Sequence, residues 1–397
     1  MVRNKPRTKK TVRRILGLML ALCILMLGGM ETLATGSTGT DTSVGSTGTD
    51  APAGTGSDNG ETGKAAVGSE PVRGIYVSAH VAGMNSMMEE IITHLDETNL
   101  NAVVIDAKND EGNVTFSMDR PLVQEAGSVQ VLVGDMPGLI SKLHDHGIYC
   151  IARCVMFRDP FIDEVHPEWM LPDEEQNVYY DSQGFSWIDP TNTEAAAYLM
   201  DIVAGCKEAG FDEVQFDYVR YATGVSEEAI GLNGYGKRTA ITRFVMNAKR
   251  TADMLGIPLS LDVFGTVINS RIDSNIVGQE YPRLSMFCDY MSPMIYPSHY
   301  YDGSFGTDVP DLHPYETIDG ALKVSIRSFA IANPAGNRKQ AKVRPWLQGF
   351  TATYLKKYRK YGAEEVKLQI QAVYDNGGDS YLIWNPSCKY PWDAFKD

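Results

Sequence analysis

Strand-like and helix-like stretches alternate along this chain from about residue 72 onward, and no other feature limits the possible folds as much. Eight strand-like runs occur, at residues 73–79, 102–107, 149–157, 213–221, 258–264, 290–296, 343–349 and 380–384. Helical stretches lie between them, at residues 84–99, 136–146, 194–209, 237–255, 320–332 and 363–376. Alternating strands and helices favour a parallel sheet, and eight such units favour a closed barrel over an open sheet. We therefore predict an α/β fold, a (β/α)8 TIM barrel over residues 71–397.

The run FDEVQFDYVRY, residues 211–221, has a clear period of two. Val214 and Phe216 share one face of this strand, while Asp217 lies on the polar face. The apolar face suits packing against helices, and the polar face would look into a site. Asp217 falls near the carboxyl end of the strand, where barrel enzymes place their chemistry. The alternative roles for this carboxylate are capping the next segment and pairing with Arg220.

The first 34 residues predict a targeting segment. Seven Lys and Arg residues within residues 1–14 precede an uncharged apolar run of 16 residues, 15–30, and a small-residue sequence that ends at Ala34. This is the order found in signal peptides. The run is short for a membrane span, which needs about 20 residues, but it could remain as a tilted signal anchor. We expect export to an extracellular or cell-surface location, with any membrane contact made through this segment alone.

Residues 35–70 consist mainly of Gly, Ser, Thr and Asp, with the sequence GSTGTD at 36–41 and again at 45–50. Such a stretch has too few apolar side chains to offset the entropy of ordering the chain. We expect a disordered linker there, between the signal segment and the barrel.

Charge and cysteine content exclude several classes of function. The net charge is −14, and no cluster of Lys and Arg follows residue 14, so nucleic acid is not an expected partner. Five cysteines follow the signal segment, an odd number without the spacing of a disulfide scaffold. Cys150 and Cys154 share a strand, which would separate their sulfurs by ~13 Å, too far for one metal ion. We expect no metal, no cofactor and a monomeric protein.

Polar and aromatic residues recur at the inward-facing positions of the predicted strands. In a barrel they would meet at one mouth, and they are Tyr76, Asp106, Lys108, Arg153, Gln215, Asp217, Arg220, Asp262, Tyr296, Trp346, Gln348, Trp384 and Asn385. Each has a structural alternative, such as an ion pair between Asp106 and Lys108 or core packing for Tyr296. Together they favour a site, because buried charges are rarely placed without a partner or a task.

Carboxylates among Trp, Tyr, Gln and Asn side chains are what glycoside hydrolysis requires. Aromatic faces stack on sugar rings, amides bond hydroxyl groups, and two carboxyl groups supply nucleophile and acid. We predict Asp217 and Asp262, on adjacent strands, as the catalytic pair. No HExxH run or GxSxG elbow occurs, which disfavours zinc and serine hydrolases.

Seven segments together resemble the bacterial family of "putative glycosyl hydrolase" domains, which is similar to the α-amylase-like barrels. The segments are RGIYVSAHVAG (73–83), NAVVIDAKNDEGNVTF (101–116), GIYCIARCVMFRDP (147–160), WIDPTN (187–192), FDEVQFDYVRY (211–221), LDVFG (261–265) and MSPMIYPSHY (291–300). The resemblance covers residues 72–390. It implies a TIM barrel and, by analogy, glycosidase activity.

In amylase-like barrels an Asp on the fourth strand is the nucleophile and a Glu on the fifth is the proton donor. Asp217 matches the first, but Asp262 stands where Glu would be expected, so Asp106 and Asp189 remain alternatives for the acid. A polysaccharide or oligosaccharide of the cell wall or extracellular space is the expected substrate. The alternative function is a barrel that binds glycan at the cell surface without turnover.

The separation of the two carboxyl groups would set the stereochemistry. A gap of roughly 5 to 5.5 Å is typical of retaining glycosidases, and about 6.5 to 9.5 Å of inverting ones. We expect Arg153 or Arg220 to hold Asp217 ionised and an apolar setting to keep Asp262 protonated, because opposite charge lowers and desolvation raises a carboxyl pKa.

Overall fold

The computed structural model describes residues 71–396. The signal segment predicted at residues 1–34 and the linker predicted at 35–70 lie outside these described residues. Within residues 71–396, no helix combines the length and the apolar character needed to cross a bilayer.

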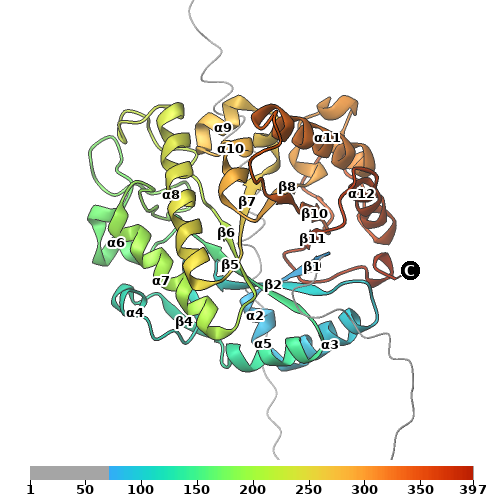
Figure 1. The fold of residues 1–397 in the computed structure, drawn as a ribbon, viewed down its shortest axis with the longest axis horizontal. Helices are drawn as coiled ribbons and strands as arrows, with labels where there is room; N and C mark the ends of the chain where they lie inside the picture. The colour runs from blue at the N-terminus through green and yellow to red at the C-terminus, as the bar shows by residue number, and fades with distance from the viewer. Residues whose placement is uncertain (1–70, 397) are drawn as a thin grey trace, which may run out of the picture.

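Eight parallel strands form the closed barrel at the centre of the protein (Figure 1). They are β1 (Arg73–Val77), β2 (Ala102–Lys108), β5 (Tyr149–Val155), β6 (Glu213–Asp217), β7 (Leu259–Phe264), β8 (Tyr290–Ile295), β10 (Trp346–Gln348) and β11 (Tyr381–Trp384). Each strand pairs with the next, and β11 pairs with β1, which closes the ring. The predicted (β/α)8 barrel is therefore confirmed, with a strand at each of the eight predicted runs.

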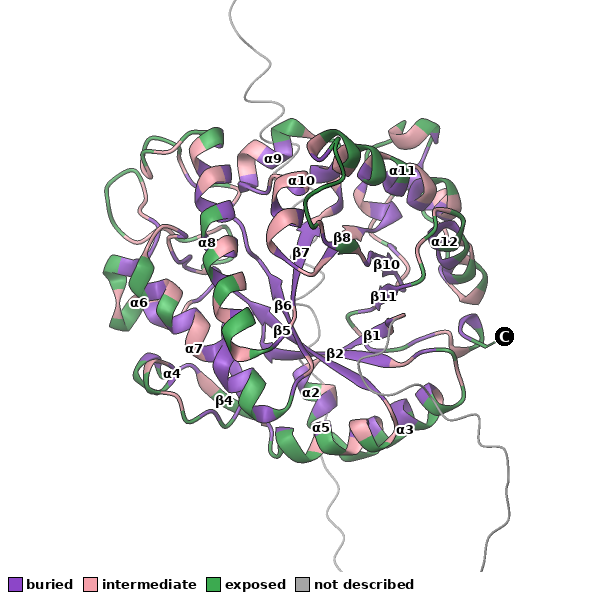
Figure 2. Ribbon diagram, viewed as in Figure 1, coloured by how far each residue is buried: buried purple, intermediate pink, exposed green. Residues whose placement is uncertain are grey.

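Helices surround the barrel as an outer layer, with buried inner sides and exposed outer sides (Figure 2). The longer ones are α3 (Asn85–Asp96), α5 (Met136–Asp145), α7 (Thr193–Ala209), α8 (Gly234–Leu255), α11 (Pro314–Ala332) and α12 (Ala363–Asp375). Shorter ones lie in the connections, namely α2 (Ala79–Ala82), α4 (Pro121–Ala126), α6 (Ile162–Val165), α9 (Arg271–Val277) and α10 (Tyr281–Leu284). The ends of α7 follow from local chemistry, since the Asn192 side chain accepts hydrogen bonds from the first turn and Gly210 adopts the left-handed conformation at the other end.

Three differences from the predicted strands go beyond a shift of one or two residues at an end. Strand β6 ends at Asp217 rather than residue 221, because Tyr218 has a φ of 50°, which no strand residue can keep. The run at 343–349 is divided into β9 (Lys342–Val343) and β10, with Pro345, which lacks an N–H donor, between them. An excursion after β2, formed by β3 (Val114–Phe116) and β4 (Val129–Val133), extends the sheet and was not predicted.

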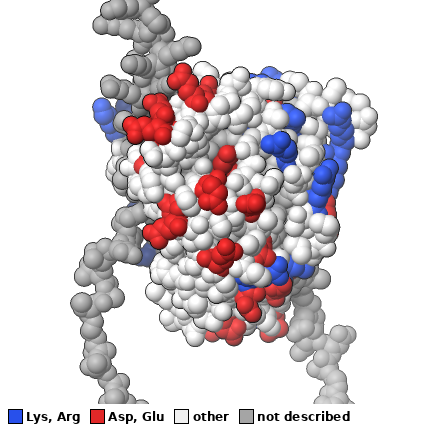
Figure 3. All heavy atoms as spheres, turned by 90° about the vertical axis from the view of Figure 1, so that its left-hand side faces the viewer, with Lys and Arg blue, Asp and Glu red and all other residues white. Residues whose placement is uncertain are grey.

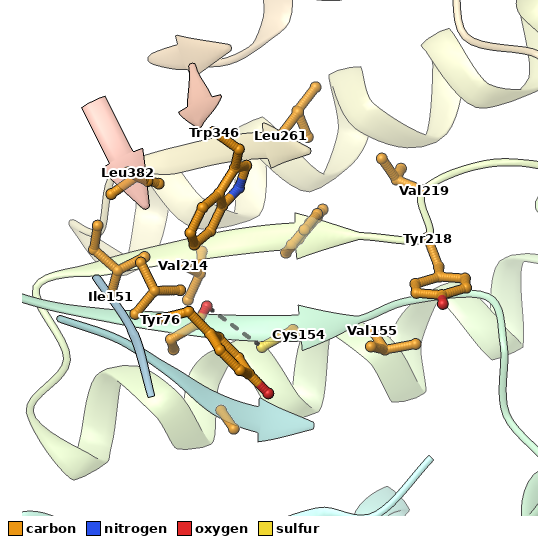
Figure 4. Packing of buried hydrophobic residues seen from close by; sticks show 14 of the residues in the cluster. Tyr76, Ile151, Cys154, Val155, Val214, Tyr218, Val219, Leu261, Trp346 and Leu382 are labelled. Atoms are coloured by element: carbon orange, nitrogen blue, oxygen red, sulfur yellow. Dashed lines mark hydrogen bonds between the residues drawn. The ribbon is translucent and has the colours of Figure 1, made fainter. Parts of the chain in front are cut away.

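Side chains fill the barrel, and charged groups lie buried toward both of its ends. Tyr76 and Trp346 lie within the space that the strands enclose, whereas Tyr218 lies beyond the end of β6 (Figure 4). At the amino end, Arg344 donates hydrogen bonds to both carboxylate oxygens of Glu213, and both side chains are fully buried. The two charges of that pair offset each other within the core, and the larger charged cluster lies at the carboxyl end of the strands.

The surface over α6, α7 and α8 carries separate acidic groups, with basic residues toward one edge (Figure 3). This face therefore offers no continuous basic area of the kind that binds a phosphate backbone. The expected lack of nucleic-acid binding stays a prediction.

Candidate active site

A cavity of about 570 Å³ opens at the carboxyl ends of the barrel strands. Eight of the predicted residues line it, namely Arg153, Asp217, Arg220, Asp262, Tyr296, Trp346, Trp384 and Asn385. Its size and its mixture of aromatic walls with a few polar groups are typical of ligand sites. The convergence expected from strand parity therefore occurs for these residues.

Asp217 is the last residue of β6, and its carboxylate is held by three hydrogen bonds. Arg153 donates from Nε and Nη2 to Oδ2 at 3.0 and 2.7 Å. The backbone N–H of Tyr218 donates to Oδ1 at 2.7 Å, a contact that its positive φ makes possible. These donors fix the orientation of the carboxylate. Of the two arginines expected to hold Asp217 ionised, Arg153 makes the direct contact.

Asp262 lies in β7 and is only 2% exposed. The indole N–H of Trp346 donates to its Oδ1 at 2.7 Å. Burial raises the pKa of Asp262 well above its usual value, and the nearby charge of Asp217 raises it further. This shift favours the protonated form of Asp262, which is the state that a general acid needs.

Arg153 bridges three carboxylates at the mouth of the barrel. Besides Asp217, its guanidinium contacts Asp106 at 2.7 Å and Asp110 at 3.0 and 3.2 Å. Although burial lowers the pKa of Arg153, the three carboxylates raise it well above its usual value. Its charge also lowers the pKa of Asp110, against the effect of burial. The guanidinium is therefore the counter-charge of the whole cluster.

Asp106 and Tyr76 lie behind the cavity wall rather than in it. The Tyr76 hydroxyl donates to Asp106 Oδ2 at 2.6 Å, and burial raises the pKa of Asp106 to about 6 despite the charge of Arg153. The Tyr76 ring packs against Trp384 with centroids 4.1 Å apart. Both residues therefore support side chains that face the cavity, and Asp106 keeps a pKa suited to proton transfer.

Lys108 and Gln215 are buried away from the cavity. A register shift after Asp106 directs the Lys108 ammonium to the Val155 carbonyl at 2.9 Å and to Asp159 at 3.2 Å. Gln215 lies deeper in the barrel, where its amide donates to Ser292 Oγ at 3.3 Å. Both residues were predicted to bind substrate, but in the structure their side chains bond to other buried groups of the protein.

Asp189 and Gln348 are also outside the cavity lining. The Asp189 carboxylate accepts hydrogen bonds from the backbone and hydroxyl of Thr191, both at 2.8 Å, and so fixes the turn before α7. The Gln348 amide accepts from Ser298 and donates to Asp311 at 3.0 Å. Asp189 is thus a poorly placed alternative for the acid, and Gln348 tethers a loop beside the site.

Residues at or soon after strand ends supply wall groups that the strand pattern did not predict. They include Tyr218, Phe264, His299 and Phe350. His299 packs edge-on against Tyr296, and burial lowers its pKa to about 4, so the ring is neutral at physiological pH. Asp110 was missed as well, although it follows β2 closely. The only sequence signal for these groups is their position at or soon after the end of a strand.

Among residues 71–396, one group has the ligand types of a metal site: His144, Cys150 and Asp212, with ligand atoms within 4.8 Å of one another. Hydrogen bonds explain this group without an ion, because Asp212 Oδ2 accepts from the Cys150 backbone at 2.7 Å and lies 2.9 Å from His144 Nε2. The group also lies at the amino ends of β5 and β6, opposite the cavity.

Replacing Arg153 with Met is expected to lower the free energy of unfolding by about 3–5 kcal/mol near pH 7.5, because buried carboxylates lose their counter-charge. This decrease in the free energy of unfolding should be smaller at pH 4.5. Without Arg153 the folded-state pKa of these carboxyls exceeds the unfolded value, so stability is present at low pH and is lost as pH rises.

Urea unfolding at the two pH values measures this effect. Arg344→Met, which removes the partner of a single carboxylate at the other end of the barrel, is the comparison variant. Equal losses at pH 4.5 and 7.5 for Arg153→Met would show that lost packing, not charge, accounts for the change.

A closed (β/α)8 barrel with paired carboxyl groups and aromatic walls at the carboxyl end of its strands defines the class of barrel glycoside hydrolases. The sequence places the chain within that class. It belongs to the family described as "Putative glycosyl hydrolase domain", whose sequence profile matches residues 74–390. The resemblance noted in the sequence is confirmed. No curated protein matches the chain.

A solved structure shows the same architecture. The glycoside hydrolase domain of PgaB (BpsB) from Bordetella bronchiseptica is similar with a TM-score of 0.60 at 12% identity, over 82% of this chain and 99% of that one. At that identity the likeness shows the fold alone. A hypothetical protein from Ruminiclostridium thermocellum ATCC 27405 is 29% identical over 48% of this chain and 97% of its own, with a TM-score of 0.44.

Proposed function

We propose that this protein is an exported glycoside hydrolase that cleaves a cell-wall or extracellular polysaccharide with two carboxyl groups. Asp217 is the nucleophile and Asp262 the acid/base. The observation that carries the proposal is the contrast between them, since Asp217 accepts three hydrogen bonds while burial raises the pKa of Asp262 well above its usual value. Two neighbouring carboxyl groups in such different surroundings are the arrangement of an acid and its partner. The support for export is the sequence of residues 1–34.

The strand register favours a retaining mechanism. β6 and β7 pair with Phe216 beside Leu261, so the next positions along the two strands are Asp217 and Asp262. Neighbouring strands lie about 4.8 Å apart, close to the carboxyl separation of retaining enzymes. Asp262 would protonate the glycosidic oxygen while Asp217 attacks the anomeric carbon. Asp262 would then deprotonate the water that releases the sugar.

Incubating the purified protein with a panel of polysaccharides tests the proposal. New reducing ends, detected by mass spectrometry, are expected for at least one glycan, and proton NMR of the first product should show the anomeric configuration of the substrate. An inverted first product would assign a water-mediated displacement instead. Binding of glycans without any product would favour the alternative, a glycan-binding barrel.

A further inference from the structure

Arg220 is a buried guanidinium that the proposed mechanism does not use. It follows β6 by three residues, is 4% exposed and lines the cavity. The rings of Trp187, Tyr218 and Phe264 surround it, each with its centroid 4.8 or 4.9 Å from the guanidinium carbon. Aromatic faces hold a guanidinium in place but do not neutralise its charge.

The hydrogen bonding of Arg220 is incomplete within the described part of the chain. Its Nη1 donates to the Tyr221 carbonyl at 3.2 Å. No residue between 71 and 396 accepts a hydrogen bond from its Nε or Nη2, and none forms an ion pair with it. Of the four other buried arginines, Arg153, Arg238 and Arg344 contact carboxylates. The fourth, Arg158, donates to the Tyr218 hydroxyl and to the Gln183 amide oxygen. Among the described residues, Arg220 is thus the buried arginine that contacts neither a carboxylate nor a side-chain hydrogen-bond acceptor.

An unpaired buried charge is costly, and burial accordingly lowers the pKa of Arg220. The charges of Asp217 and Asp181 raise that pKa, but neither carboxylate bonds to the guanidinium. Long-range attraction to the carboxylate cluster can reduce the cost of burial. It does not occupy the Nε and Nη2 donors, which form the edge of a guanidinium that binds a carboxylate with two parallel hydrogen bonds.

We propose that Arg220 is a subsite for a sugar carboxylate, so that the substrate is an acidic glycan containing uronic acid residues. The proposal rests on the proposed glycoside hydrolase function for turnover, but not for binding. The Trp187, Tyr218 and Phe264 rings hold the guanidinium, and its free edge receives the carboxylate. Two charge-assisted hydrogen bonds in a shielded site give such a contact both strength and orientation.

The test compares uronic acid oligosaccharides with the same oligosaccharides after chemical reduction of their carboxyl groups. Binding is measured by calorimetry with the Asp217→Asn variant, so that no turnover is needed. We expect at least about tenfold tighter binding of the acidic form, a difference of about 1.4 kcal/mol. Equal binding of the acidic and reduced forms would overturn the proposal, whatever any Arg220 variant does.

Two further variants, Arg220→Gln and Arg220→Lys, are each combined with Asp217→Asn. They test whether the preference for the acidic oligosaccharide depends on Arg220. We expect the first to remove the preference and the second to keep part of it, because Lys retains the charge without the two-donor edge. Arg158→Gln is the matched control. Arg158 is also buried and stacks on Tyr218, at 5.5 Å, but it does not line the cavity. If Arg158→Gln reduces the preference for the acidic oligosaccharide as much as Arg220→Gln does, general positive potential explains the effect. The subsite at Arg220 is then disproved.

Turnover separates this proposal from the proposed function. An acid preference that depends on Arg220, in a protein that hydrolyses no glycan, would refute the hydrolase and keep the subsite. Hydrolysis of neutral glycans with no acid preference would keep the hydrolase and refute the subsite.

Discussion

Replacing Asp217 with Asn is expected to lower kcat by about 10³-fold or more while leaving glycan affinity within a few-fold of the parent. The amide keeps the size of the side chain but is a far weaker nucleophile. Binding should persist because the aromatic walls, including Trp384 and Tyr296, are unchanged. Single-turnover kinetics for hydrolysis and calorimetry for affinity measure the two effects separately.

Asp201→Asn is the control for this variant. Asp201 forms an ion pair with Arg120 on the outer layer, at 2.6 Å, and lies in α7 away from the cavity. Its replacement should change kcat by less than about twofold, since only a partly exposed pair is lost. A parental rate in Asp217→Asn would make Asp217 a structural partner of Arg153 and favour the glycan-binding alternative.

The barrel could be predicted because its signals are local. In β6, Val214 and Phe216 face the helices while Asp217 faces the interior. This alternation of apolar and polar side chains can be recognised within five consecutive residues. Gly210 at the end of α7 is similarly a local signal, since its φ of 102° suits glycine. Patterns of this kind fix which elements form and which faces they bury.

The site was only partly predictable, because its contacts join distant parts of the chain. Asp110 reaches Arg153 across 43 residues, and only closure of the barrel brings the two together. Lys108 has the parity of an inward residue, but the register shift after Asp106 directs its ammonium to Asp159. The turn that directs the Tyr218 N–H toward Asp217 depends on a positive φ at Tyr218. A tyrosine at that position does not predict a positive φ.

Asp262→Asn is expected to lower kcat/KM by about 10² to 10⁴-fold on natural glycans, the range for loss of a general acid. On a substrate with an activated nitrophenyl leaving group the loss should be much smaller, because such a group departs with little protonation. In the parent protein, burial raises the pKa of Asp262 well above its usual value, which favours retention of its proton. Activity should therefore fall as pH rises through that pKa, and the Asn variant should lack this alkaline decline.

Trp346→Phe provides a graded test of the same assignment. The indole donates a hydrogen bond to Asp262 Oδ1, and this bond lowers the pKa of the carboxyl group. Its loss should move the alkaline limb of the pH–rate profile to higher pH while the mechanism is kept. An unmoved limb, together with parental activity of Asp262→Asn on both substrates, would assign the acid elsewhere. Asp106 would then be the next candidate, because its pKa is about 6 and Arg153 links it to Asp217.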